Sequence, residues 1–485
     1  MFKKRISLLF LVIIILILNI IISSTFVFSI DNLEVWEADS MTKVGLNDNS
    51  QNFDGKITIY AAKNENENFQ IILLPSTSMD IEISITDMIH DSDLISNNLV
   101  SIYQVGYIST IDRDENYNDV DYGMLPDPLI PISSAISLDQ GINQPIWFKV
   151  RIPGTAQEGL YTGTITLTAN SQIRVIPIEL LVYDFALPDN PSLQSQFGVT
   201  SSASGSFGKF YNLDTYDERL ELLKKFYDKF EENRLNPINI AYYYLYDFWD
   251  AFTFDCTNDE LVDVDFTLMD PIYEYCADTL GFKHIRFPIT NTIPVRWDRQ
   301  NGVGCKDYSW DNYQLSDEFK KVQKEYIDIV SEHFEQKGWM ENSVVYLTDE
   351  PCAYTQSFAY PSSHPSYGLV KQYYDHIKDS NPKLKWVQTE NVESSLYDHT
   401  DLWIPGYKQY SEYDADERRI YGQEAWWYNV GSRIQTPGVK TRAILWDSYS
   451  RNLDGILDWG VNYWTYNTVN ENPWEGTTRG GDGYL

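Results

Sequence analysis

The chain has 485 residues, and its 70 acidic residues against 37 basic ones give a formal net charge of −33 at pH 7. A surface this acidic repels polyanions, which excludes nucleic acid and bare anionic membranes as partners. The length exceeds that of one ordinary compact core, so we expect two domains.

The first thirty residues predict export. Lys3, Lys4 and Arg5 precede a long apolar run that begins at Ile6, which is the layout of a signal sequence. The run is long for a cleaved signal and no clean small-residue cleavage site follows it, so an uncleaved signal anchor is the alternative. No later segment has about eighteen consecutive apolar residues, so we expect membrane contact only through residues 1–30. In either case the mature chain is secreted or displayed at the cell surface.

Four cysteines suit an exported protein with one or two disulfides. They are Cys256, Cys276, Cys305 and Cys352. Four cysteines allow three pairings, and the sequence does not choose among them. The paired C-x-x-C spacing of zinc sites and the H-E-x-x-H motif are both missing from the sequence, so we expect no metal site.

Residues 31–188 predict an antiparallel β-sandwich. Side chains suited to a buried face alternate with side chains suited to a wet face over residues 147–152, and threonine alternates with aliphatic residues over 164–168. Several short strands of this kind, separated by turn residues and without intervening helical periods, are typical of a sandwich.

Residues 192–485 predict a (β/α)8 barrel. Pro188 and Pro191 mark the boundary, and strand-like and helical runs alternate after them. Amphipathic helices are expected within 217–233 and after Ser316 as an N-cap. Eight strands are expected at 193–200, 238–245, 283–289, 343–350, 384–390, 401–406, 424–430 and 460–467. The chain stops about twenty residues past the last of these, so we expect a barrel truncated at its C-terminus, without its final helix.

Two adjacent carboxylates end the fourth of these strands, in the segment SVVYLTDEP. Barrel active sites lie at the carboxyl ends of the strands, where Asp349 and Glu350 fall. Pro351 favours an extended Glu350, from which both carboxylates can reach the same mouth. In an exported, aromatic-rich protein such a pair fits glycoside hydrolysis, in which one acid must stay protonated. The alternative is the solvated start of a loop.

Several segments together resemble glycoside hydrolase family 123, a family of β-N-acetylgalactosaminidases and their relatives. The resemblance rests on SVVYLTDEP, EAWWYNV, RAILWDSYSRNLDGILDWGVNYW, NPWEG and GGDGYL, and, in the first domain, on KNENENFQ and VRIPGTAQEGLYTGTITL. It implies a β-sandwich followed by a catalytic barrel. It also implies removal of terminal β-linked N-acetylhexosamine, most often N-acetylgalactosamine, from a glycoprotein, glycolipid or oligosaccharide, without a metal or organic cofactor.

The resemblance further implies a retaining mechanism in which the substrate's own acetamido oxygen attacks the anomeric carbon and forms an oxazolinium. Asp349 would orient the acetamide and stabilise its developing charge, while Glu350 would protonate the glycosidic oxygen and later activate water. Since like charges this close discourage simultaneous ionisation, we expect the pair to titrate as a unit that retains one proton, on Glu350.

Aromatic residues near strand ends are candidates for stacking on a sugar, with ordinary core packing as the alternative for each. They are Trp249, Trp427, Tyr428, Tyr463 and Trp464.

Glu424 supplies a rival mechanism. With Glu350 as the acid, it would be the nucleophile of a double-displacement glycosidase, or else a ligand of a substrate hydroxyl. It opens its strand instead of closing it, and strand openings face the stability side of a barrel, which counts against the rival. A noncatalytic extracellular glycan-binding protein is the third possibility.

Overall fold

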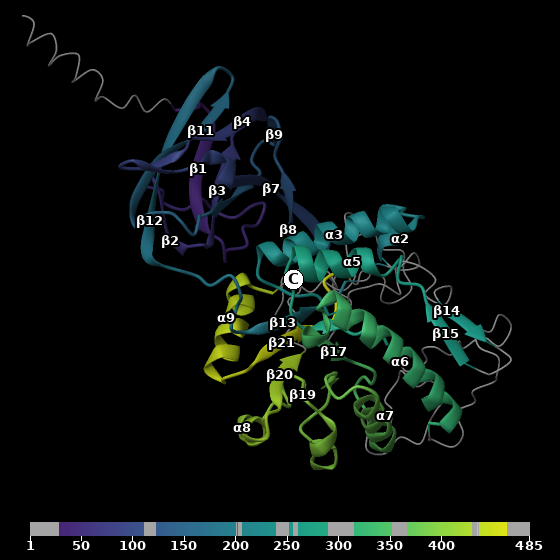
Figure 1. The fold of residues 1–485 in the computed structure, drawn as a ribbon. Coiled ribbons are helices and arrows are strands. Elements are labelled where there is room, and N and C mark those ends of the chain that lie inside the picture. The colour runs from purple at the N-terminus through teal and green to yellow at the C-terminus, as the bar shows by residue number, and fades with distance from the viewer. Residues whose placement is uncertain are drawn as a thin grey trace, which may run out of the picture. The chain divides into compact units, whose positions relative to one another are not determined.

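The structure is a computed structural model, and it describes residues 29–110, 123–199, 201, 206–238, 252–255, 260–289, 315–351, 366–428, 434 and 436–462 (Figure 1). The chain divides into two compact units. The first comprises Met1–Tyr107 and Met124–Pro188, and the second comprises Ile108–Gly123 and Asp189–Leu485.

The first unit is built from two β-sheets. One has the order β1 (Leu33–Asp39), β3 (Asn66–Pro75), β10 (Gln144–Arg151), β7 (Val100–Thr110) and β8 (Gly123–Pro131). The other has the order β2 (Ile57–Lys63), β12 (Gln172–Ala186), β11 (Gly159–Ala169), β4 (Met79–Ile85) and β9 (Ile136–Leu138), with β5 (Met88–His90) and β6 (Asp93–Ile95) beside β11. A 3-10 turn, η1 (Asn97–Leu99), precedes β7. The strands from β1 to β7 in the first sheet and from β12 to β9 in the second pair antiparallel, whereas β2 pairs with β12 in parallel.

Both sheets contribute to one apolar core, as the alternation in the sequence predicts. Phe69 and Phe148 stack from the first sheet at 4.8 Å between ring centroids, and Leu167 and Leu180 come from the second. In β11 the alternate threonines face the other way, so this sheet has one dry face and one wet face.

The second unit contains a curled parallel sheet whose strands lie side by side in Figure 1. Its order is β13 (Gln194–Phe197), β21 (Gly455–Asp458), β20 (Glu424–Tyr428), β19 (Leu402–Trp403), β18 (Lys385–Gln388), β17 (Ser343–Val345) and β16 (Ile285–Arg286). On the far side of β13, Phe197 forms a parallel bridge with Pro237, directly before the second expected strand, most of which lies outside the described residues.

The last expected strand is misplaced. We expected it at 460–467, whereas β21 ends at Asp458 and pairs with β20 and β13. Gly455 weakens the strand pattern there, but the fold requires a glycine, because a Cβ at this position would lie 2.4 Å from the ring of Trp426.

Helices and turns connect the strands. They are α2 (Ser206–Tyr211), α3 (Tyr216–Glu232), α5 (Asp270–Glu274), the π-helical turn η3 (Tyr275–Thr279), α6 (Asp317–Lys337), η4 (Met340–Asn342), α7 (Tyr367–Ser380), η5 (Ser394–His399), α8 (Glu412–Ile420) and α9 (Gly438–Ser450). A hairpin of β14 (Phe252–Asp255) and β15 (Glu260–Val264) stands apart from the sheet.

The two amphipathic helices predicted from the sequence are confirmed. Thr215 caps α3 in a reciprocal capping box with Glu218, and the Ser316 side chain accepts from the backbone of Phe319 at the start of α6. Gly338, at φ 78°, ends α6 in the left-handed conformation that favours glycine. None of the described helices is long and apolar enough to cross a bilayer.

Cys276 is a free thiol with no exposed surface, and burial raises its pKa well above the usual value. The other three cysteines lie outside the described residues. With Cys276 unpaired, three cysteines remain and can form at most one disulfide, so the two-disulfide alternative is wrong.

Candidate active site

The carboxylates of the SVVYLTDEP segment lie at the carboxyl edge of the parallel sheet, where the sequence predicts them. Asp349 comes four residues after β17 ends and forms a parallel bridge with Thr389, the residue that follows β18. This part of the site therefore comes from the ends of two neighbouring strands.

Two hydroxyl groups hold the Asp349 carboxylate. The hydroxyl of Tyr346 donates to Oδ1 at 2.6 Å and that of Thr389 donates to the same oxygen at 2.9 Å. Residues three apart in a regular strand face opposite sides, so Tyr346 can reach Asp349 only because the chain leaves regular strand geometry between them. Within the described part of the chain no donor reaches Oδ2, which leaves that oxygen for a ligand.

Glu350 adopts a backbone conformation that we did not expect. Instead of being extended before Pro351, it has a φ of 39°, in the left-handed region. Its N–H donates to Thr389 Oγ1 at 3.1 Å and its Oε1 accepts a short hydrogen bond from the Tyr428 hydroxyl. These two bonds offset the backbone strain of the left-handed conformation, which costs about 1–3 kcal/mol. The same conformation interrupts the strand alternation that would point the side chains of Asp349 and Glu350 to opposite faces.

Both tyrosines of the site remain hydrogen-bond donors. Burial raises the pKa of Tyr346 well above its usual value, and the negative charge of Asp349 raises it further. Burial also raises the pKa of Tyr428, with the hydrogen bond to Glu350 as the next cause. Arg286 donates to the backbone oxygen of Tyr346, and its guanidinium lies 5.1 Å from the centre of that ring, which fixes the tyrosine in place.

A third carboxylate belongs to this cluster, and sequence reasoning missed it. Glu390 directly follows Thr389, and Asn391 N donates to its Oε1 at 2.7 Å. Burial raises the pKa of Glu390, and the negative charges of Glu393 and Glu350 add to that shift. The available signal was the LKWVQTE segment, which ends a strand in Thr-Glu much as SVVYLTDE ends the preceding one in Thr-Asp-Glu.

The structure separates the two aromatic candidates on β20. Tyr428 lies in the site, but its hydroxyl binds Glu350. Trp427 points to the opposite face, is 1% exposed, and packs against Tyr407 and Tyr410 at 4.8 and 5.5 Å between ring centroids. The placement of Trp427 favours the core-packing interpretation. Trp249, Tyr463 and Trp464 lie outside the described residues.

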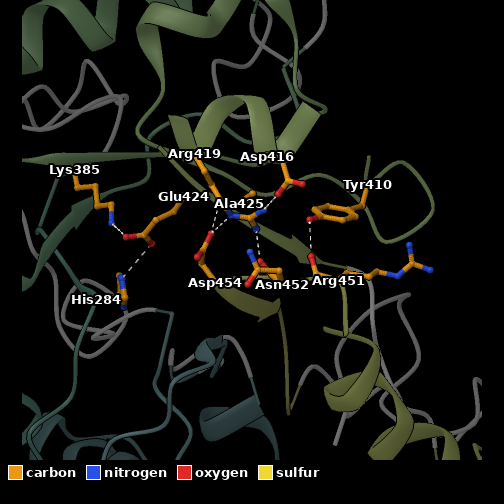
Figure 2. A network of polar contacts seen from close by, with 10 residues as sticks. All are labelled: His284, Lys385, Tyr410, Asp416, Arg419, Glu424, Ala425, Arg451, Asn452 and Asp454. Carbon is orange, nitrogen blue, oxygen red and sulfur yellow. Dashed lines mark hydrogen bonds and ion pairs between the residues drawn. The ribbon is translucent and has the colours of Figure 1, made fainter. Parts of the chain in front are cut away.

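The structure does not place Glu424 near Glu350. Glu424 opens β20, four residues before Tyr428, which places it about 13 Å away along the strand at roughly 3.3 Å per residue. Figure 2 shows it paired with Lys385, with His284 Nε2 at 3.8 Å on the other carboxylate oxygen. Burial lowers the pKa of His284 to about 4, so this histidine is neutral at pH 7.

The arrangement places two carboxylates side by side, with Tyr346 and Thr389 holding that of Asp349 and Tyr428 holding that of Glu350. Such a pair can protonate a leaving group and stabilise a neighbouring positive charge in one step. Among the described residues, no group of His, Cys, Asp and Glu side chains could hold a metal ion.

Two models of one protein family match the chain. A family model described as "Glycoside hydrolase 123, catalytic domain" matches residues 217–485, and one described as "Glycoside hydrolase 123 N-terminal domain" matches residues 43–169. No curated protein matches the chain.

Among solved structures, a family 123 glycoside hydrolase from Clostridium perfringens, studied for the details of glycolipid glycan hydrolysis, superimposes with a TM-score of 0.65. It is 16% identical, and the match covers 94% of this chain and 82% of that one. The CooA pilin subunit of enterotoxigenic Escherichia coli matches 31% of this chain and 98% of its own, at 12% identity and a TM-score of 0.17. A FixG-related protein from Vibrio parahaemolyticus matches 32% of this chain and 98% of its own, at 11% identity and a TM-score of 0.16, and neither of these two carries weight.

Proposed function

Since the chain belongs to glycoside hydrolase family 123, and is therefore a glycoside hydrolase, we propose that it removes terminal β-linked N-acetylhexosamine, with N-acetylgalactosamine as the preferred sugar. The observation that carries this proposal is the pair Asp349–Glu350, adjacent in the chain yet held by separate partners. The glycan would be that of a glycoprotein, a glycolipid or a free oligosaccharide.

The proposed mechanism uses the substrate's acetamido oxygen as the nucleophile. The oxygen attacks the anomeric carbon as the glycosidic bond breaks, and an oxazolinium forms. Asp349 accepts the acetamide N–H on Oδ2 and stabilises the charge that develops on nitrogen, while Tyr346 and Thr389 keep Oδ1 in place. Because the acetamide needs orientation within a fraction of an ångström, a carboxylate fixed by two hydroxyls suits this role.

Glu350 serves as the acid and then as the base. Tyr428 donates to Oε1, so the acidic proton belongs on Oε2, which delivers it to the leaving oxygen. In the second half-reaction the same carboxylate takes a proton from the water that opens the oxazolinium. That the pair retains one proton before reaction stays a prediction, and a flat pH-rate profile from acid to neutral would argue against it.

The fold and the location of the enzyme form part of the same proposal. We infer that the curled sheet closes into a (β/α)8 barrel, because Pro237 bridges Phe197 of β13 and so extends the sheet beyond its described strands. The two sheets of the first unit would be the family's β-sandwich. The basic residues and apolar run at the start of the sequence support export to the medium or the cell surface.

The test is hydrolysis of p-nitrophenyl 2-acetamido-2-deoxy-β-D-galactopyranoside, with the gluco epimer and the plain galactoside beside it. We expect turnover of the acetamido sugars alone, inhibition by a thiazoline analogue of the oxazolinium, and loss of turnover in Asp349→Asn and Glu350→Gln. Glu221→Gln, an exposed carboxylate on α3, is the matched control. Turnover of the plain galactoside without thiazoline inhibition would refute the assisted mechanism, and no turnover of any of them would favour a binding protein.

A further inference from the structure

The outer face of the second sheet in the first unit carries a row of exposed aromatic rings. Tyr60 of β2 is 54% exposed, and Tyr183 and Phe185 of β12 are 42% and 56% exposed. The rings of Tyr60 and Tyr183 stack at 6.5 Å with 18° between their planes, and those of Tyr183 and Phe185 stack at 5.9 Å with 9°. We call these three residues the aromatic platform.

The hydrophobic core does not account for the platform. Side chains alternate along both strands, and the core positions next to the platform are already filled by Ile59 and Val182. Leu181 pairs with Tyr60 on one side and with Leu160 on the other. Leu160 is 46% exposed and extends the apolar area. Contiguous exposed apolar surface of this kind marks a binding surface in a soluble protein.

Polar groups surround the rings. Glu179 lies in the register row that also holds Thr58 and Thr162, and it forms a partly exposed ion pair with Lys56 at 2.8 Å. Lys63 lies 3.1 Å from Asp184. Hydroxyls, carboxylates and ammonium groups beside a row of aromatic rings can hydrogen-bond to a ligand that carries many hydroxyl groups. The overall charge of −33 disfavours an anionic ligand.

We propose that the aromatic platform is a second glycan-binding site, distinct from the hydrolytic one, and that its ligand is a neutral β-linked oligosaccharide of pyranose sugars. The C–H face of a pyranose is apolar and slightly positive, so it stacks on the negative face of an aromatic ring. Exposed rings whose planes are nearly parallel and whose centres lie 5.9 and 6.5 Å apart can contact successive sugars, whereas buried protein interfaces favour rings inserted in pockets.

The platform would keep the enzyme on a polymeric or densely displayed glycan. A second weak site on the same chain raises the effective concentration of chain ends at the hydrolytic site without changing the chemistry there. Loss of the platform should therefore affect large displayed substrates and leave small soluble ones alone.

The experiment measures binding of chitohexaose and laminarihexaose to the full chain carrying Glu350→Gln, by calorimetry. We expect chitohexaose to bind at two sites. An excess of p-nitrophenyl N-acetylgalactosaminide should displace it from the hydrolytic site and leave it bound at the platform, which we call the undisplaced site. Tyr60→Ala with Tyr183→Ala should remove the undisplaced site or weaken it at least tenfold. Tyr183→Phe, which keeps the ring, should retain it. Tyr413→Ala, an exposed tyrosine of α8 in the other unit, is the matched control.

In the active chain the double variant should turn over the p-nitrophenyl substrate as the parent does. That readout also shows that the variant folds, and Tyr183→Phe against Tyr183→Ala repeats the comparison with a milder change. The proposal is overturned if neither hexasaccharide gives an undisplaced site, or if the double variant binds as the parent does. It is also overturned if sedimentation shows a dimer that the double variant dissociates, since the platform would then bind a second copy. The binding result is independent of whether the chain hydrolyses any of the acetamido sugars.

Discussion

Removing the hydroxyl of Tyr428 tests whether this residue positions Glu350, the proposed acid. In the Tyr428→Phe variant the ring remains and the short hydrogen bond to Glu350 Oε1 is lost. The ring packs with the apolar residues on the inner face of β20, so the variant keeps its packing. We expect a lower rate constant for the chemical step and little change in substrate affinity, because the hydroxyl binds the carboxyl group.

The magnitude follows from the kind of bond. A hydrogen bond to a charged or ionisable partner in a desolvated setting contributes about 1.5–3 kcal/mol. Each 1.36 kcal/mol changes a rate tenfold, so kcat should fall by about 10-fold to 150-fold. The free energy of unfolding should change by less than this, since Glu350 keeps its backbone bond to Thr389.

The assay compares two leaving groups. A p-nitrophenyl glycoside needs little help from an acid. The sugar released from a disaccharide is a poor leaving group, so its departure depends on protonation. The loss in kcat should therefore be larger for the disaccharide, with KM within about twofold for both. Tyr410→Phe, whose hydroxyl donates to the backbone of Arg451 (Figure 2), is the matched control. Equal losses for both substrates, or a loss seen mainly in KM, would refute the positioning role.

Three further changes test other parts of the structure. Thr389→Val removes the hydroxyl that Asp349 and the Glu350 N–H share. We expect kcat to fall by about 10-fold to 100-fold and the free energy of unfolding in urea to fall by about 1–3 kcal/mol. An unchanged kcat would contradict this. Burial raises the pKa of Asp458 to about 7, so the folded chain favours its neutral form. The free energy of unfolding should therefore fall by at most about 4 kcal/mol as pH rises from about 4 to about 7. Asp458→Asn should remove this fall, which melting curves across the same pH range would measure. Glu424→Gln breaks the pair with Lys385 and should lower the melting temperature while kcat stays within about twofold, whereas a loss of several orders of magnitude would make Glu424 the nucleophile.

The sequence predicted those features that depend on local pattern. The capped helices α3 and α6, the strands that contain β13 and β16 to β20, and the position of Asp349 and Glu350 at a strand end all follow from periodicity and capping residues. The misplaced strand β21 shows where pattern fails, because Gly455 is explained only by the ring of Trp426 on the neighbouring strand.

The residues that hold the two carboxylates could not be found in this way. Thr389 lies 40 residues beyond Asp349, and their contact depends on the register between β17 and β18. Tyr428 lies 78 residues beyond Glu350 and was a candidate for stacking on a sugar or for core packing, since no local signal marks a hydroxyl that donates to a distant carboxylate. Trp427 and Tyr428 are neighbours in sequence, and only the register of β20 in the sheet decides which of them faces the site.

Both sites argued above involve departures from the simple rules of β-structure. A residue before proline should be extended, yet Glu350 has a φ of 39°, and this places two adjacent carboxylates where each meets a different hydroxyl group. The wet face of a sheet should be polar, yet Tyr60, Tyr183 and Phe185 stack there in the open. Such departures cost free energy that packing alone does not repay, so they are expected where a chain binds or reacts. A search for positions that break the local rule therefore finds the acid pair and the aromatic platform with one criterion.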